Sequence, residues 1–137
     1  MNVENALYPT PDRIADLMGD ASDKPIVMLN LLKFRDKALY ADGRKSELTG
    51  REAYMLYGVP MQKLVAREGG RFIFSGQILS LAIGTVEEMW DVVALMEYPS
   101  SAAFARIATS PEVSEIGVHR AAGLAGQLLI RVAALPV

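Results

Sequence analysis

The sequence predicts an α+β fold of the ferredoxin-like class, and two observations support this prediction. After a short leading helix, strand and helix patterns follow one another in the order β, α, β, β, α, β. This is the order of the split βαβ arrangement, in which four antiparallel strands carry both helices on one face. The first strand, 26–34 (IVMLNLLKF), is apolar on both sides, so we expect the face without helices to be buried against a second copy in a homodimer.

A short helix, a strand and a charged connection are predicted in the first third of the chain. Thr10 can cap a helix over 10–18, because its hydroxyl can accept a backbone hydrogen bond and the proline that follows suits the first helical position. The strand 26–34 comes after a polar linker and has an almost continuous apolar run. Residues 35–48 are charged and contain an Asp-Gly turn pair, which indicates a loop or a small hairpin.

Capping residues and glycines define the remaining elements. Thr49 and Glu52 fit a capping box at the start of a long helix, and a serine precedes each of the two later helices. β-branched and aromatic residues mark the strands, and Gly76 indicates a bulge in one of them. The predicted ranges are 50–68 (helix), 71–83 and 90–98 (strands), 100–108 and 110–123 (helices) and 127–134 (strand).

Length and composition predict one globular domain, 1–137, with 1–24 as an N-terminal helix and linker and 25–134 as the ferredoxin-like core. The net charge of −2, with no long basic run, argues against a nucleic-acid partner. The absence of cysteine and the presence of one histidine exclude disulfides and thiolate or multi-histidine metal sites, and we expect neither a metal nor a cofactor. No secretory leader and no apolar stretch of membrane-spanning length is visible, so we expect a cytoplasmic protein without membrane association.

Several short motifs of the chain resemble one known family. These motifs are GGRFIFSG at 69–76, EYPS at 97–100, SPE at 110–112, Arg120, and the opening strand with its charged insert. Together they resemble, over roughly 25–134, the longer branch of the family called domain of unknown function 1330, which belongs to the dimeric α+β barrel superfamily. The resemblance implies a homodimer in which two sheets form an α+β barrel, with ligands held between sheet and helices. It implies no defined activity, because the superfamily includes cofactor-free monooxygenases, haem-binding peroxidase-like proteins and stress-response proteins.

Arg120 is the most unusual polar residue of the predicted core. It lies in the middle of the apolar arc of the helix 110–123 that should face the sheet, and a buried guanidinium requires an acceptor. Glu97, on a neighbouring strand, could form a structural ion pair with it. A ligand with a carboxylate or carbonyl group could supply the acceptor instead, or the arginine head could reach solvent. Both residues are therefore candidate ligand-binding residues.

Four further polar residues are candidates for a site between the sheet and the helices. The carboxamide of Asn30 could orient a ligand oxygen or satisfy a neighbouring backbone group. Tyr54 and Tyr57 either pack in the core or exchange a proton with a substrate, so they join Arg120 as catalytic candidates, and Tyr57 is also a candidate ligand contact. Ser75 stands where the family usually carries an arginine; it is a candidate ligand contact, but no histidine or aspartate has the spacing that would make it a nucleophile.

The aromatic residues and the one histidine have structural explanations. His119 should point away from the sheet and form an exposed pair with Glu115, which argues against a role as general base. Trp90, Phe72, Phe74 and Phe104 are expected in the core.

The candidate residues predict a protein that binds a small molecule. It could be a cofactor-independent enzyme, similar to an oxygenase or isomerase, that acts on a small apolar or aromatic substrate with a carbonyl or acid group. Asn30 and Arg120 would polarise the oxygen, and Tyr54 or Tyr57 would transfer a proton. The alternative is a non-catalytic stress-response or structural dimer; a haem-binding peroxidase-like protein would need an axial ligand, and the outward direction of His119 argues against it. An open cavity lined by Asn30, Tyr57 and Arg120 would favour ligand binding, and a filled interior would favour a structural role.

Overall fold

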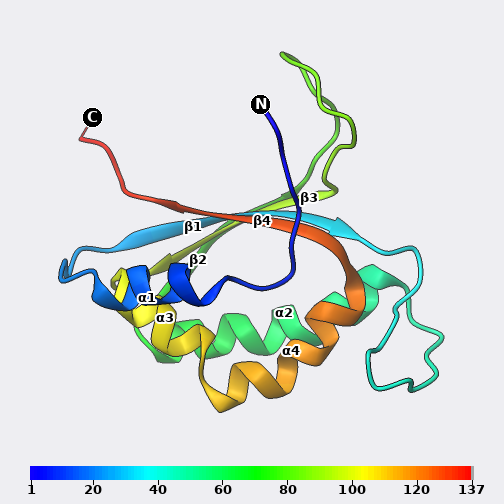
Figure 1. Ribbon diagram of the computed structural model, residues 1–137, viewed down its shortest axis with the longest axis horizontal. Helices are drawn as coiled ribbons and strands as arrows, with labels where there is room; N and C mark the ends of the chain where they lie inside the picture. The colour runs from blue at the N-terminus through cyan, green and yellow to red at the C-terminus, as the bar shows by residue number, and fades with distance from the viewer. Residues whose placement is uncertain (137) are drawn as a thin grey trace.

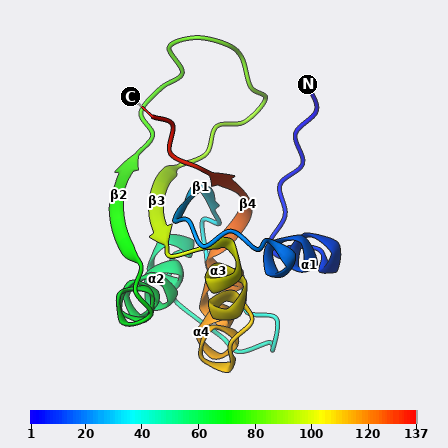
Figure 2. The ribbon, with the colours of Figure 1, turned by 90° about the vertical axis from the view of Figure 1, so that its left-hand side faces the viewer.

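The computed structural model describes residues 1–136 and contains a four-stranded antiparallel sheet in the order β2-β3-β1-β4, with the helices on one of its faces (Figure 1). Viewed from the side, α2 lies beneath β2 and β3, and α3 and α4 lie beneath β1 and β4 (Figure 2). The predicted ferredoxin-like α+β fold is thereby confirmed. The elements are α1 (Pro11–Gly19), β1 (Ile26–Phe34), α2 (Gly50–Arg67), β2 (Arg71–Gln77), β3 (Val92–Tyr98), α3 (Ser101–Ala108), α4 (Pro111–Gly123) and β4 (Leu124–Val132).

Side-chain caps begin each helix where the sequence predicts one. The Thr49 hydroxyl accepts a hydrogen bond from the Glu52 amide at 3.1 Å, and the Glu52 carboxylate accepts one from the Thr49 amide at 2.9 Å, which completes the capping box of α2. The same kind of hydroxyl cap opens the other three helices. The capping residues are Thr10 for α1, Ser100 for α3 and Ser110 for α4.

The predicted strand 71–83 is too long, because β2 ends at Gln77. Gln77 pairs with Val92, the first residue of β3, and after the Ile78 amide bonds to the Asp91 carbonyl at 2.8 Å the chain has no strand to pair with. An apolar run without a hydrogen-bonding partner cannot continue a sheet. The connection 78–91 instead extends away from the sheet on the side opposite the helices (Figure 1).

The predicted bulge and two of the predicted core aromatic residues also need correction. The register of β2 shifts between Phe72 and Phe74, not at Gly76. Because β2 is an edge strand, Phe72 remains 41% exposed and Phe74 54% exposed. Phe104 is buried as predicted, and Trp90 is half-buried.

The helix-covered face of the sheet has an apolar end and a polar middle. At the apolar end, side chains from β1, β3, α2 and α3 form the main core, which consists of Ile26, Met28, Met61, Leu64, Val65, Tyr98, Phe104 and Ile107. Further along β1 the same face carries Asn30 between the buried Met28 and Leu32. The polar middle therefore lies beside the core, on the helix-covered face of the sheet.

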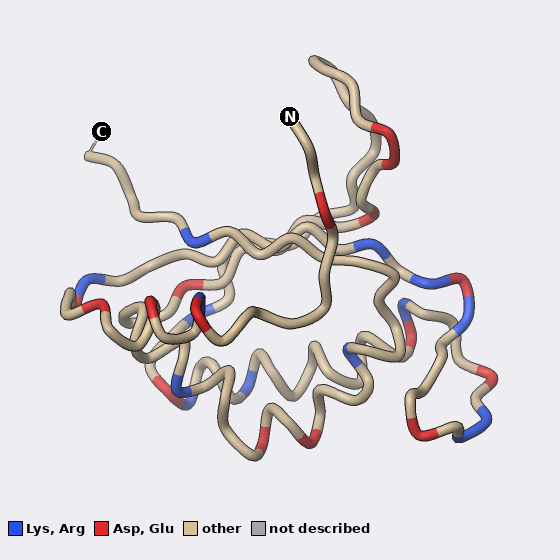
Figure 3. Tube along the Cα trace, viewed as in Figure 1, with Lys and Arg blue, Asp and Glu red and all other residues tan. Residues whose placement is uncertain are grey.

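The opposite face of the sheet is apolar and has no helix over it. Directly paired residues of antiparallel strands share a face, so the register places one apolar side chain from every strand in a single row across the sheet. This row consists of Phe74, Leu95, Leu29 and Ile130. Charged residues are concentrated in the helices and loops (Figure 3). Those on this open face pair near its ends, Arg71 with Glu97 at 2.9 Å and Lys33 with Glu88 at 3.5 Å.

Two glycines allow α2 and α4 to touch through their backbones. A methyl group at Gly123, the last residue of α4, would overlap the Gly50 carbonyl oxygen and lie 2.8 Å from the Tyr54 amide nitrogen. A methyl group at Gly50 would overlap the Arg35 carbonyl oxygen. Only hydrogen side chains permit this crossing, which brings Arg120 of α4 close to Tyr54 of α2.

Candidate functional site

A chain of hydrogen bonds joins α4 to the polar middle of the sheet. Arg120 Nη1 donates to Gln127 Oε1 at 2.6 Å, and Gln127 Nε2 donates to Asn30 Oδ1 at 2.9 Å. Asn30 Nδ2 then donates, at 3.3 Å each, to the carbonyls of Met28 and Ala94. A guanidinium can only donate, so it fixes the orientation of both carboxamides along the chain.

Arg120 meets only neutral groups. Its Nη2 donates to the main-chain carbonyl of Leu7, and its guanidinium carbon lies 5.2 Å from the centre of the Tyr8 ring and 6.0 Å from that of Tyr57. Within residues 1–136 it forms no ion pair with a carboxylate. The positive charge of a half-buried arginine is therefore not compensated by the described part of the chain.

The ion pair between Arg120 and Glu97 that we considered from the sequence is not formed. Glu97 is paired across the strands with Val27 and Arg71, which places it on the open face, away from α4. Its carboxylate accepts a hydrogen bond from Arg71 Nε at 2.9 Å. Glu97 lies outside the site because successive residues of a strand point to opposite faces of the sheet, and Met96, not Glu97, faces the helices.

Two tyrosines of α2, Tyr54 and Tyr57, lie near Arg120, and a third, Tyr98, belongs to the core beside them. The rings of Tyr54 and Tyr57 are 5.6 Å apart on α2, and Tyr57 packs against the core cluster that contains Tyr98. Burial, as the largest cause, raises the pKa of all three side chains, while the positive charge of Arg120 opposes this rise at Tyr54 and Tyr57. All three therefore carry a proton at neutral pH and can donate a hydrogen bond.

None of these three tyrosine hydroxyls bonds to another protein group within residues 1–136, yet none is sealed off. Arg35 Nε is the one enclosed side-chain nitrogen or oxygen without a partner in this part of the chain. Each unpaired tyrosine hydroxyl therefore retains some surface that a water molecule or a ligand can reach. Buried tyrosine hydroxyls normally find a protein partner, so Tyr54 and Tyr57 offer two free donors near the uncompensated charge of Arg120, and Tyr98 offers a third within the core.

The raised pKa values predict a loss of stability in alkaline solution. Each folded-state pKa lies above the ordinary value of 10.0, so the stabilising contribution is present below pH 10 and is lost as the pH rises through the folded-state pKa. We expect Tyr54, Tyr57 and Tyr98 to ionise together with unfolding, when tyrosinate absorbance and circular dichroism are followed in one alkaline titration. Ionisation of all five tyrosines near pH 10 with the circular dichroism unchanged would contradict this.

Ser75 lies on the same face of the sheet as Asn30 but at its far edge. It pairs with Ala94, which pairs with Asn30, so the three occupy one row across the sheet. Ser75 is exposed. It could contact only a ligand that extended across the whole row.

His119 does not form the exposed pair with Glu115 that its helix position indicates. Its Nδ1 lies 2.6 Å from the hydroxyl of Tyr40, which is 6% exposed and comes from the connection between β1 and α2. The connection between β1 and α2 therefore packs against the His119 side of α4. His119 thus holds the connection in place.

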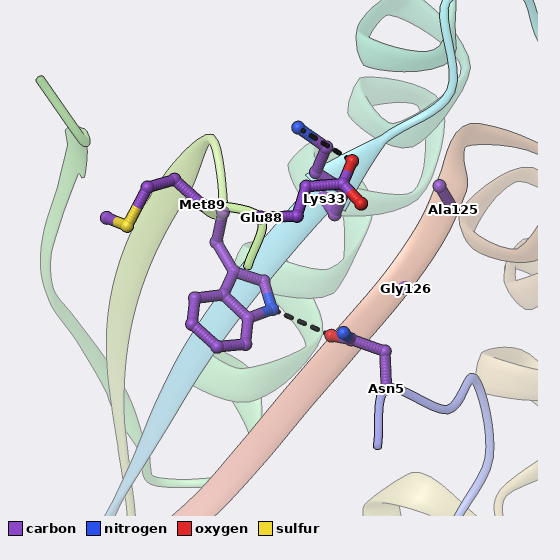
Figure 4. Close-up of a pocket in the computed structure, with 7 residues that line it drawn as sticks. Asn5, Lys33, Glu88, Met89, Ala125 and Gly126 are labelled. Carbon is purple, nitrogen blue, oxygen red and sulfur yellow. Dashed lines mark hydrogen bonds and ion pairs between the residues drawn. The ribbon is translucent and has the colours of Figure 1, made fainter. Parts of the chain in front are cut away.

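Two surface hollows in residues 1–136 are lined by none of the predicted site residues. One, of about 90 Å³, is lined by Asn5, Lys33 and Glu88, among others (Figure 4). The other, of about 270 Å³, lies between α2, α3 and α4 near Arg67 and Glu112. The described residues also contain no group of three or more potential metal-ligating side chains, and none of their helices has the length and apolar character of a membrane span.

Comparison with known proteins identifies the family. The family model described as domain of unknown function (DUF1330) matches residues 43–133. The chain belongs to this family. Solved structures similar to this DUF1330 protein include a protein of unknown function from Rhodopseudomonas palustris. It is 36% identical with a TM-score of 0.86, and the match covers 98% of this chain and 100% of that one.

Two further structures are similar. The methylated form of the same Rhodopseudomonas palustris protein is 37% identical with a TM-score of 0.86, over 96% of each chain. A dimeric protein of unknown function with a ferredoxin-like fold, from Bacteroides fragilis, has a TM-score of 0.52 at 17% identity, over 78% of this chain and 93% of that one. The comparison with curated proteins found no match. The resemblance to DUF1330 is thus confirmed, and these neighbours assign no activity.

The structure of this DUF1330 protein adds residues that sequence reasoning missed. Strand alternation alone could have placed Gln127 on one sheet face with Leu129 and Arg131, because these three residues are two apart in the predicted strand 127–134. Tyr98 belongs to the EYPS motif at 97–100, which carries the family resemblance and has no spacing that marks Tyr98 as a site residue. Leu7 and Tyr8 precede the first helix and carry no pattern that would place them at Arg120.

Proposed function

We propose that this DUF1330 protein binds a small compound with a carboxylate or carbonyl group between the helix face of the sheet and helices α2 and α4. The observation that carries the proposal is the Arg120 guanidinium, which is half-buried and faces only neutral groups. A carboxylate adds the attraction of opposite charges to its hydrogen bonds with a guanidinium, and it can accept two parallel bonds from the same arginine. An anionic ligand would therefore supply the negative charge that the described part of the chain does not place beside Arg120.

The surroundings of Arg120 support a compact apolar or aromatic body on the same ligand. Tyr54 packs against Phe34 with ring centres 5.5 Å apart and against Tyr57 with ring centres 5.6 Å apart. These rings give apolar contact area, and the free tyrosine hydroxyls can donate to a second ligand oxygen. If the protein catalyses a reaction, a neutral tyrosine would act as a proton donor to an oxygen polarised by Arg120, since burial disfavours tyrosinate.

Two observations favour the alternative of a structural dimer without a ligand. Gln127 and the Leu7 carbonyl already accept hydrogen bonds from Arg120, and neither of the two surface hollows described above is lined by Asn30, Tyr57 or Arg120. In that case the polar chain would only join α4 to the sheet. A binding experiment separates these two functions.

The test compares Arg120→Met and Gln127→Glu with the unchanged protein, using calorimetric titration with benzoate, pyruvate and phenylpyruvate. Arg120→Met removes the cation, and we expect it to weaken carboxylate binding about 10- to 100-fold, because hydrogen bonds to a charged group contribute about 1.5–3 kcal/mol. Gln127→Glu keeps the shape but places a carboxylate 2.6 Å from Arg120 Nη1, so it should abolish binding.

Arg67→Met is the matched control, since Arg67 pairs with Glu112 on the outer surface and is 56% exposed. It should bind like the unchanged protein. If Arg120→Met binds any of the three acids as well as the unchanged protein does, the carboxylate site is refuted and the structural role is favoured.

We further propose that the protein is a homodimer joined through the open face of its sheet. The apolar row across all four strands supports this, because an apolar surface of that extent on a soluble chain is normally covered. The Bacteroides fragilis neighbour is described as dimeric. The charged pairs at the ends of the open face would form the rim of such an interface.

A further inference from the structure

The residues before α1 lie across the outer edge of the candidate site. Residues 5–8, which we call the strap, run beside β4, the edge strand, where the Ala6 amide donates to the Gln127 carbonyl at 3.2 Å. The Leu7 carbonyl accepts from Arg120, and the Tyr8 ring faces the same guanidinium. The strap therefore contacts both Gln127 and Arg120, which belong to the proposed ligand site.

We infer that the strap is a displaceable internal occupant of the ligand site, with the Leu7 carbonyl holding the place on Arg120 that a ligand carboxylate takes. This inference rests on the proposed function and adds its regulation. A neutral carbonyl is the weaker acceptor for a guanidinium, so a carboxylate of suitable shape outcompetes it. The strap then leaves Arg120 when the ligand enters.

The strap is built to detach without disturbing the fold. Asn5, Ala6 and Tyr8 are exposed and only Leu7 is half-buried, so little apolar surface is uncovered when it moves. Leu129, which shares the helix face with Gln127, is 42% exposed. The edge of the sheet beside the strap is thus already open to solvent, and this opening lies next to Asn30 in the strand register.

A second attachment fixes the far end of the strap and provides a reporter. Trp90 Nε1 donates to Asn5 Oδ1 at 2.7 Å, and Asn5 lies against Gly126 of β4 (Figure 4). A methyl group added at Gly126 would lie 2.6 Å from Asn5 Cβ, and the nearest atoms around it all belong to the Asn5 side chain. Trp90 is the one tryptophan of the chain, so its indole N–H gives a single resonance that senses whether the strap is attached.

The experiment records the Trp90 indole resonance of full-length ¹⁵N-labelled protein during titration with benzoate, pyruvate and phenylpyruvate. Asn5→Ala removes the acceptor and supplies the reference position of a free indole. We expect the acid that binds to move the indole resonance of the unchanged protein towards that position. Asn5→Ala and Gly126→Ala, which loosen the strap from two different elements without touching Arg120, should both bind this acid about 3- to 10-fold more tightly.

The outcomes separate the two proposals. If calorimetry shows binding but the indole resonance stays in place and both strap variants bind with unchanged affinity, the strap inference is overturned and the ligand site stands. If the acids bind only to the strap variants, both proposals are supported, because the attached strap then blocks the site. If no acid binds to any of these proteins, the ligand site is refuted and the strap inference falls with it.

Discussion

Gly123→Ala is expected to destabilise the protein by about 3 kcal/mol or more, at the upper end of the cost of overpacking, because the new methyl group meets backbone atoms that cannot rotate away. It would overlap the Gly50 carbonyl oxygen and lie 2.8 Å from the Tyr54 amide nitrogen. The helices α2 and α4 would have to separate by about 1 Å to restore ordinary contact distances. Urea denaturation at one fixed protein concentration measures the loss.

Gly117→Ala is the matched control in the same helix. Apart from its chain neighbours and the backbone of its own helix, no atom lies within 4 Å of a methyl group at Gly117, and alanine is more favourable than glycine inside a helix by about 0.8–1 kcal/mol. We therefore expect this variant to be slightly more stable than the unchanged protein. Equal stability of the two variants would show that α2 and α4 do not meet through Gly50 and Gly123.

Leu29→Glu is expected to convert the protein from a dimer of about 30 kDa, twice the 14.9 kDa chain mass, into a monomer. Leu29 is on the central strand β1, in the apolar row that crosses the open face between Leu95 and Ile130. In a dimer joined through this face, the substitution places a carboxylate from each copy in a dry interface, where an unpaired buried charge is strongly unfavourable. Light scattering coupled to gel filtration gives the mass.

Leu56→Glu makes the same chemical change on α2, where Leu56 is 48% exposed. It should remain a dimer with normal solubility. A monomeric mass for the unchanged protein at micromolar concentration, or an unchanged dimer for Leu29→Glu, would refute the interface on the open face.

Local patterns were sufficient for most of the fold. The hydroxyl caps at Thr10, Thr49, Ser100 and Ser110 and the apolar run 26–34 depend on neighbours in the chain, so the starts of all four helices and both ends of β1 agree with the prediction. The end of β2 was wrong by six residues, since it depends on where β3 begins to pair, and β3 comes from a distant part of the sequence. The prediction that Phe72 and Phe74 are buried was wrong, because the local sequence does not show whether a strand lies at the edge or in the centre of the sheet.

For the candidate site, the sequence by itself determined that Arg120 lies on the face of α4 towards the sheet and that Asn30, Tyr54 and Tyr57 face the same layer. Only the tertiary structure decided which acceptors Arg120 meets. Strand pairing turned Glu97 to the opposite face and brought in Gln127, and the chain before α1 added Leu7 and Tyr8. Side-chain direction follows from local periodicity, whereas the partner of a side chain depends on contacts between segments far apart in the chain, for which the sequence carries no local signal.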